Sequence, residues 1–156
     1  MLTFCLFVTI AQTFCYTIEP IPVVNDSEVV QMATDMITRY EWFSHDAYLD
    51  TSGRYSIGYG TRSHAGEKIT YAEGYARMQS VIRGSLNRIK NDFPNATKYE
   101  YTALLSLYYN CHGWYKKVLK NWYDAWLEKW FCELPWHSGL TKRRNEEKSL
   151  LWYSME

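Results

Sequence analysis

The stretch from Glu41 to Gly60 constrains the fold most. A helical pattern ends at the start of this stretch, and a hairpin pattern lies within it. Before this stretch, apolar residues recur at the spacing of one helix face: Val29, Val30, Ala33, Met36, Ile37 and Tyr40. Inside it, the turn cluster Thr51–Arg54 separates two short tyrosine-rich runs, which is typical of a β-hairpin. The sequence therefore predicts a helix that ends at or near Glu41 and a hairpin directly after it.

Two carboxyl residues of this stretch, Glu41 and Asp50, are placed to face one another across a cleft. Glycoside hydrolysis commonly needs one carboxyl group that stays protonated and a second that stays ionised. The aromatic neighbours Tyr40, Trp42 and Phe43 are expected to desolvate Glu41 and so favour its protonated form. Asp50 borders a polar turn and is expected to stay hydrated and charged.

Each carboxyl group also has an ordinary structural interpretation. A glutamate at a helix end is usually a solvated surface residue. An aspartate before Thr-Ser-Gly is usually a turn former whose side chain bonds its own backbone. The flanking pattern and a second match near the C-terminus favour the catalytic interpretation.

Length and charge restrict the class of protein. A chain of 156 residues indicates one domain with a sizeable core. Lys plus Arg and Asp plus Glu both number 17, so no strong field favours a nucleic acid as partner. The seven Trp and 14 Tyr suit a core and a sugar-binding groove equally.

The N-terminal segment is apolar, and it carries no Lys, Arg, Asp or Glu before Glu19. It is shorter than the roughly 20 residues that a membrane-spanning helix needs. We therefore expect a signal or signal-anchor segment and linker over residues 1–22, followed by one domain over residues 23–156. This predicts an exported or extracytoplasmic protein, with a transient membrane association through residues 1–17. A buried N-terminal strand is the alternative.

Start and stop signals divide the rest of the chain into elements. Asp26 or Ser27 is expected to cap the first helix of the domain. A polar loop is predicted over residues 61–68. A capping box at Thr70 and Glu73 then opens a long helix that ends at Phe93-Pro94.

Three further helices are predicted in the C-terminal half. The most apolar one, Lys98–Asn110, is expected at the centre of a helical lobe. An aromatic helix over residues 114–131 follows, with a stripe that suits a core better than a sugar platform: Trp122, Trp126 and Trp130. The last helix is expected to dock through Leu150, Leu151 and Trp152.

The cysteines leave the redox state open. Cys5 and Cys15 lie in the leader, whereas Cys111 and Cys132 either pair in an exported chain or remain buried free thiols. No Cys-x-x-Cys or His-Glu-x-x-His motif is present, so no metal site and no cofactor are predicted. The adjacent Cys111-His112 pair does not suit a cysteine hydrolase, because neighbours on a helix point apart.

Two motifs resemble the phage-type lysozymes, glycoside hydrolase family 24. The first is the order Glu41, eight residues, Asp50, five residues, Ser56, followed by Ile57-Gly58-Tyr59-Gly60. The second is a closing motif, Gly-Leu-x-x-Arg-Arg-x-x-Glu, matched at Gly139, Leu140, Arg143, Arg144 and Glu147. The resemblance implies an α+β, lysozyme-like fold. A small N-terminal lobe with a helix and a hairpin would be joined by a long helix to a C-terminal helical lobe.

The resemblance also implies a function and roles for residues. Members of the family are muramidases that cleave the β-1,4 bond between N-acetylmuramic acid and N-acetylglucosamine in peptidoglycan. Glu41 matches the general acid, Asp50 the second catalytic carboxylate and Ser56 the hydroxyl residue that helps to hold water. An arginine of the closing motif pairs with the catalytic glutamate in the family. Arg143 is the candidate here, and Arg144 is the alternative.

Two departures from the family pattern are visible. Trp42 stands where the family usually has glycine, and Ser56 stands where it usually has threonine. They keep open a non-catalytic wall-binding protein on the same fold, and the leader keeps open a membrane-held lysis accessory. The family's usual inverting outcome needs a carboxyl separation of roughly 6.5 to 9.5 Å. We expect a monomer with peptidoglycan as its partner, and the sequence assigns no substrate-binding residues.

Overall fold

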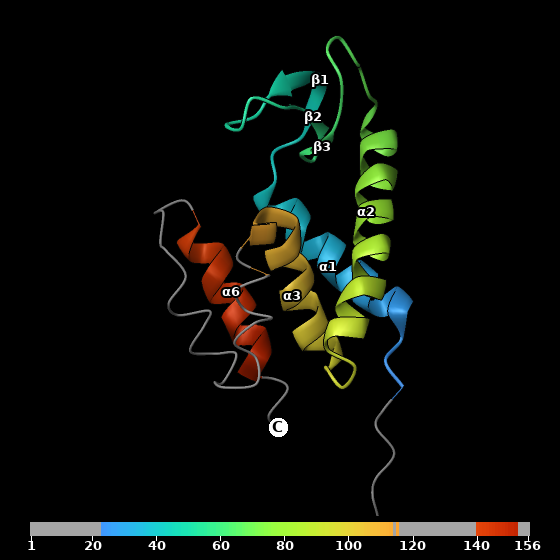
Figure 1. Cartoon of the computed structure of the whole chain (residues 1–156), viewed down its shortest axis with the longest axis vertical. Helices are drawn as coiled ribbons and strands as arrows, with labels where there is room; N and C mark the ends of the chain where they lie inside the picture. Colours follow the sequence, from blue (N-terminus) through green and yellow to red (C-terminus); the bar gives the residue numbers. More distant parts are fainter. Residues whose placement is uncertain (1–22, 114, 116–139, 153–156) are drawn as a thin grey trace, which may run out of the picture.

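The computed structural model describes residues 23–113, 115 and 140–152. The elements in chain order are α1 (Asp26–Tyr40), β1 (Ser44–Leu49), β2 (Tyr55–Gly58), β3 (Thr61–Arg62), α2 (Tyr71–Asp92), α3 (Lys98–Asn110) and α6 (Thr141–Trp152). Figure 1 shows the small sheet at one end of the molecule, the helices α1, α3 and α6 at the other, and α2 extending from the sheet along the helices. The predicted α+β architecture of a sheet lobe and a helical lobe is confirmed.

Helix α1 begins earlier than the sequence indicated, at Asp26. The predicted caps Asp26 and Ser27 are wrong, because Asn25 is the N-cap and its Oδ1 accepts a hydrogen bond from the backbone N–H of Ser27 at 3.0 Å. Asn25 has the extended backbone that a cap needs, whereas Asp26 is already helical. The predicted apolar face is buried, and it packs against α3 and α2 rather than against the sheet. The first helix therefore belongs to the helical lobe.

The sheet is antiparallel and has the strand order β1-β2-β3. The first two strands are the predicted hairpin. The third strand corrects the loop predicted over residues 61–68, because Thr61–Arg62 pairs with β2. Gly58 and Gly60, with φ values of 62° and 83°, form the tight turn that brings β3 back onto β2.

Helix α2 joins the two lobes. It opens with the predicted capping box, in which Thr70 Oγ1 accepts from the Glu73 backbone N–H at 3.2 Å and Glu73 Oε2 accepts from the Thr70 backbone N–H at 2.8 Å. It ends at Asp92, with Phe93 as C-cap. Because α2 contacts β2 and β3 as well as α1 and α3, it fixes the position of the sheet on the helical lobe.

Gly74→Ala is expected to destabilise the protein by about 1 to 3 kcal/mol, because a Cβ at this position would lie 2.5 Å from Cε2 of the Phe43 ring. Gly84→Ala in the same helix is the matched control, since nothing lies within 4 Å of its added Cβ. The control is expected to gain up to about 1 kcal/mol from helix propensity. Denaturant unfolding measures both free energies, and equal changes in the two variants would contradict the close packing at Gly74.

Helix α3 is the centre of the helical lobe, as predicted. Every residue from Tyr101 to Leu107 is buried, and a second capping box, Thr97 with Glu100, starts the helix. Helix α6 packs on α3 and buries Leu151 together with three charged residues: Arg143, Arg144 and Glu147. Side chains of opposite charge therefore lie inside the contact between α3 and α6.

Some predictions lie outside the described residues. They concern the N-terminal segment of residues 1–22, Cys132, Gly139, the side chain of Trp152, and the aromatic helix over residues 114–131 except Tyr115. Within the described ranges, no helix has the length and apolarity needed to cross a membrane. Those ranges also contain no group of three or more His, Cys, Asp or Glu side chains suited to a metal ion.

Candidate active site

Glu41 is the residue at which α1 ends. It is the C-cap, with an extended backbone (φ −98°, ψ 125°), and its N–H donates to the Ile37 carbonyl at 2.9 Å. The chain therefore leaves the helix at Glu41 and turns toward the sheet lobe. Glu41 thus lies at the junction of the two lobes.

The surroundings of Glu41 differ from those expected. Its side chain is 23% exposed. Trp42 does not help to bury it, because Trp42 is 88% exposed, and Phe43 instead packs against Tyr59 and Tyr71. An extended chain sends successive side chains to opposite sides, so the sequence neighbours of Glu41 need not cover it.

Arg143, from the first turns of α6, contacts Glu41 directly. Its Nη1 lies 2.6 Å from Glu41 Oε1, and its side chain is 1% exposed. The guanidinium is also held from α3, where its Nε donates to Ser106 Oγ and its Nη2 donates to the Ser106 carbonyl, both at 3.0 Å. Arg144 does not take this place, since it donates a hydrogen bond to Asn110 and forms an ion pair with Glu147.

Asp50 follows β1 and begins the hairpin turn. Its Oδ1 accepts hydrogen bonds from the Ser52 backbone N–H, the Ser52 hydroxyl and the Arg54 backbone N–H at 2.8, 2.6 and 3.0 Å. Its Oδ2 lies 3.1 Å from Nη1 of Arg62 on β3. Hydrogen bonds from Ser52 and Arg54, with help from Arg62, hold the pKa of Asp50 well below its usual value. Asp50 is therefore both the turn former and an ionised carboxylate.

Ser56 and Tyr48 are paired residues of the sheet. Ser56 pairs with Tyr48 on one side and with Arg62 on the other, so their side chains share one face. Burial, together with the charges of Glu41 and Asp50, raises the pKa of Tyr48. A Cβ built on Gly60 would lie 3.9 Å from Glu41 Oε2 and 4.0 Å from the Tyr48 hydroxyl. The Tyr48 hydroxyl is thus within electrostatic reach of both carboxyl groups.

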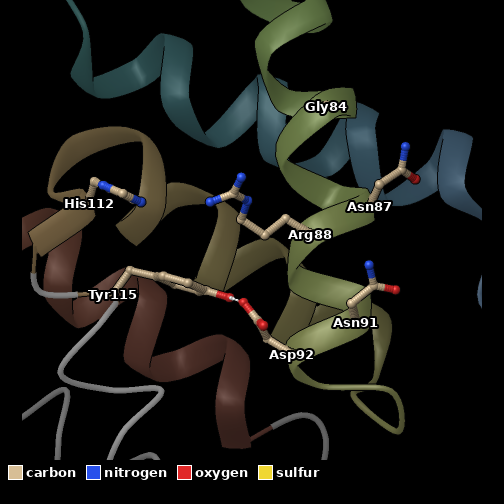
Figure 2. A pocket seen from close by; sticks show the side chains of 7 residues that line it. All are labelled: Gly84, Asn87, Arg88, Asn91, Asp92, His112 and Tyr115. Carbon is tan, nitrogen blue, oxygen red and sulfur yellow. Dashed lines mark hydrogen bonds between the residues drawn. The ribbon is translucent and has the colours of Figure 1, made fainter.

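Of two surface hollows, one is lined by a candidate catalytic residue and the other is not. Glu41 lines one of about 370 Å³ with, among others, Trp42, Tyr59 and Tyr71, whereas Asp50 and Ser56 do not line it. A hollow of about 590 Å³ lies between the C-terminal half of α2 and residues 112 and 115 (Figure 2). Its lining carries the hydrogen bond from the Tyr115 hydroxyl to Asp92 at 2.7 Å, and none of the candidate catalytic residues.

The contact with Arg143 can position the Glu41 carboxyl group, and the hydrogen bonds of the hairpin turn can keep Asp50 ionised. The sequence analysis proposed Glu41, Asp50, Ser56 and Arg143 as site residues but assigned no contact to Ser106, Tyr48 or Arg62. The four-residue spacing of Arg143 and Glu147 on a helix was the available signal for their contact. Nothing in the local sequence marks Ser106, which lies among apolar residues of α3.

Comparison with known proteins assigns the chain to a family. The sequence model described as phage lysozyme matches residues 38–147. The muramidase domain of SpmX from Asticaccaulis excentricus has a similar structure, with a TM-score of 0.65 and 20% identity over 76% of this chain and 93% of that one. No curated protein sequence matches the chain.

Two phage enzymes have the same fold. The endolysin of Escherichia coli O157:H7 phage FAHEc1 has a TM-score of 0.58 and 20% identity over 80% of this chain and 92% of that one. The active form of P1 phage endolysin Lyz has a TM-score of 0.61 and 17% identity over 81% of this chain and 85% of that one. Since the family match spans residues 38–147 and includes the Glu41, Asp50, Ser56 and Arg143 positions, the protein belongs to the phage lysozyme family.

Proposed function

We propose that the protein is a muramidase that hydrolyses the β-1,4 bond between N-acetylmuramic acid and N-acetylglucosamine in peptidoglycan. Glu41 is the general acid that protonates the leaving oxygen. Asp50 is the second carboxylate, which directs the water or stabilises the oxocarbenium-like transition state. Ser56 helps to hold the water, and Arg143 orients Glu41.

The observation that carries the proposal is the contact between Glu41 and the buried Arg143 at 2.6 Å, at the junction of the two lobes. A buried guanidinium fixed by Ser106 limits the orientations of the Glu41 carboxyl group, and a fixed acid is what proton transfer requires. The lowered pKa of Asp50 supports its role as the carboxylate that stays ionised.

Purified peptidoglycan tests the activity directly. The full chain is incubated with wall fragments, and new reducing ends and the masses of released muropeptides are measured. Muropeptides that end in reducing N-acetylmuramic acid support the proposal, because they identify the broken bond. Binding to the wall without new reducing ends favours the alternative, a non-catalytic wall-binding protein in which Trp42, exposed beside Glu41, serves recognition only.

Asp50→Asn is expected to lower the turnover of peptidoglycan by roughly 100-fold. The amide keeps an Oδ1 acceptor for the turn but loses the negative charge that faces the substrate. Asp46→Asn is the matched control, because Asp46 lies in β1 of the same hairpin, is 67% exposed and pairs with Lys68. Initial rates on a wall suspension measure both. Equal rates for the two variants would remove Asp50 from the mechanism.

The place of action follows from the substrate. Peptidoglycan lies outside the cytoplasmic membrane, so the enzyme has to reach that side, and we propose residues 1–17 as the segment that directs export or a transient tether. The proposed enzyme works as a monomer and needs no cofactor, since acid/base hydrolysis by two carboxyl groups is complete without one.

A further inference from the structure

The interior contact between α3 and α6 contains more charge than the proposed mechanism uses. Arg143 is 1% exposed, Arg144 is 3% exposed and Glu147 is fully buried. Burying ionised groups costs free energy unless they are paired, and removing one partner leaves the other uncompensated. These three buried charged side chains are connected to the candidate active site, because Arg143 contacts Glu41.

Glu147 shares Arg143 with Glu41. The Nε atom of Arg143 lies 3.4 Å from Glu147 Oε1, while its Nη1 contacts Glu41 Oε1 at 2.6 Å. The same Oε1 of Glu147 accepts from Ser106 Oγ at 2.6 Å and lies 2.9 Å from Arg144 Nη2. Among the described residues Glu147 Oε2 has no hydrogen-bond partner, so the contacts of this carboxyl group converge on one oxygen.

Glu147 contributes a negative charge that makes the formal charge of the cluster zero. Arg143 and Arg144 together bring two positive charges, and Glu41 and Glu147 bring two negative charges. Without the Glu147 charge, two guanidinium groups would act on Glu41 alone. A guanidinium in contact with a carboxyl group favours its ionised form, which is the wrong form for a general acid.

We propose that Glu147 is a positioning residue that balances the charge of Arg143, so that Arg143 orients Glu41 without holding it in the ionised form. The proposal rests on the proposed role of Glu41 as general acid. Burial raises the pKa of Glu147, against Arg144, Ser106 and Arg143, which lower it. The contacts with Arg144, Ser106 and Arg143 therefore favour the negative charge that the charge balance requires, whereas burial opposes it.

Other titratable groups near the cluster come from α1, β1, the turn after it, α3 and α6. They are Tyr40, Tyr48, Asp50, Tyr109, Cys111 and Glu146. Burial raises the pKa of Tyr40 to about 12 and raises the pKa values of Tyr48 and Tyr109, so these tyrosines stay neutral. Glu146 is occupied by Arg39 and the Tyr40 hydroxyl. Among the described residues, Glu147 is the carboxylate that forms ion pairs with both guanidinium groups.

Two variants that change the charge of the cluster in opposite directions test the proposal. Glu147→Gln keeps the oxygen acceptor and removes a negative charge, so the alkaline limb of the pH–rate profile is expected to move down by about one pH unit. Arg144→Gln removes a positive charge, so the limb is expected to move up. Ser106→Ala removes hydrogen bonds without changing the charge and is expected to lower the rate with the limb unmoved. Glu147→Asp restores the charge and is expected to restore the limb.

The titration of the Glu41 carboxyl carbon, followed by ¹³C NMR and assigned with Glu41→Gln, separates this proposal from the proposed function. Opposite shifts of the Glu41 midpoint in Glu147→Gln and Arg144→Gln support charge balancing even if the activity profile does not follow. In that case the role of Glu41 as acid fails. Midpoints that stay fixed, or that move in the same direction in both variants, overturn the proposal. If Glu147→Gln does not fold, the direction of the Arg144→Gln shift decides.

Discussion

Glu41→Gln is expected to lower the turnover of peptidoglycan by roughly 1,000-fold, the largest loss of activity that we expect from any single substitution. Glutamine has the size of glutamate and keeps an oxygen for Arg143 Nη1, so the contact at 2.6 Å has a substitute. The amide cannot give up a proton to the leaving oxygen. The loss should therefore appear in kcat, with KM little changed.

Loss of turbidity of a wall suspension measures the rates, and circular dichroism verifies that the variant is folded. Glu28→Gln is the matched control, because Glu28 lies at the other end of α1, is 45% exposed and pairs with Lys98. The control should retain the wild-type rate. A Glu41→Gln protein that clears the suspension as fast as the control would exclude Glu41 as the general acid.

Arg143→Met is expected to destabilise the protein by about 3 to 5 kcal/mol, the largest loss of stability among our predictions. Methionine can fill much of the space of the aliphatic stem, but it leaves Glu147 without one of its two guanidinium partners in a site that is closed to solvent. Glu41 loses its partner at the same time. The free energy of unfolding in guanidinium chloride, extrapolated to water, measures the effect.

Arg39→Met is the control for this prediction. Arg39 also forms an ion pair with a glutamate of α6, Glu146, but its side chain is 53% exposed. An exposed pair contributes at most about 1 kcal/mol, so the control should unfold close to the wild type. Free energies of unfolding that agree for the two methionine variants would show that the buried cluster does not stabilise the contact between α3 and α6.

Helix boundaries were the most predictable part of the fold, because the signals that set them are local. The capping box of Thr70 and Glu73 spans three residues, and the apolar face of α1 repeats every three or four. The cap of α1 was an exception, because the sequence analysis considered Asp26 and Ser27 and the structure places Asn25 there. The strand β3 was missed because two residues carry too little pattern to be recognised.

For the candidate site, the order of Glu41, Asp50 and Ser56 was recognised from sequence, but their surroundings were not. Trp42 follows Glu41 directly and was expected to cover it, yet it is 88% exposed. The side chain that contacts the Glu41 carboxyl group is instead Arg143, which lies 102 residues away in the chain.

The sequence by itself determined the helices within the described residues, the hairpin and the family to which the chain belongs, since all three depend on residue types at short, fixed spacings. Only the tertiary structure decided which groups surround Glu41 and that Ser106 and Glu147 hold Arg143. The burial and pairing of a charged side chain depend on which distant elements pack against it. The packing of α6 on α3 cannot be predicted from any short segment of the chain.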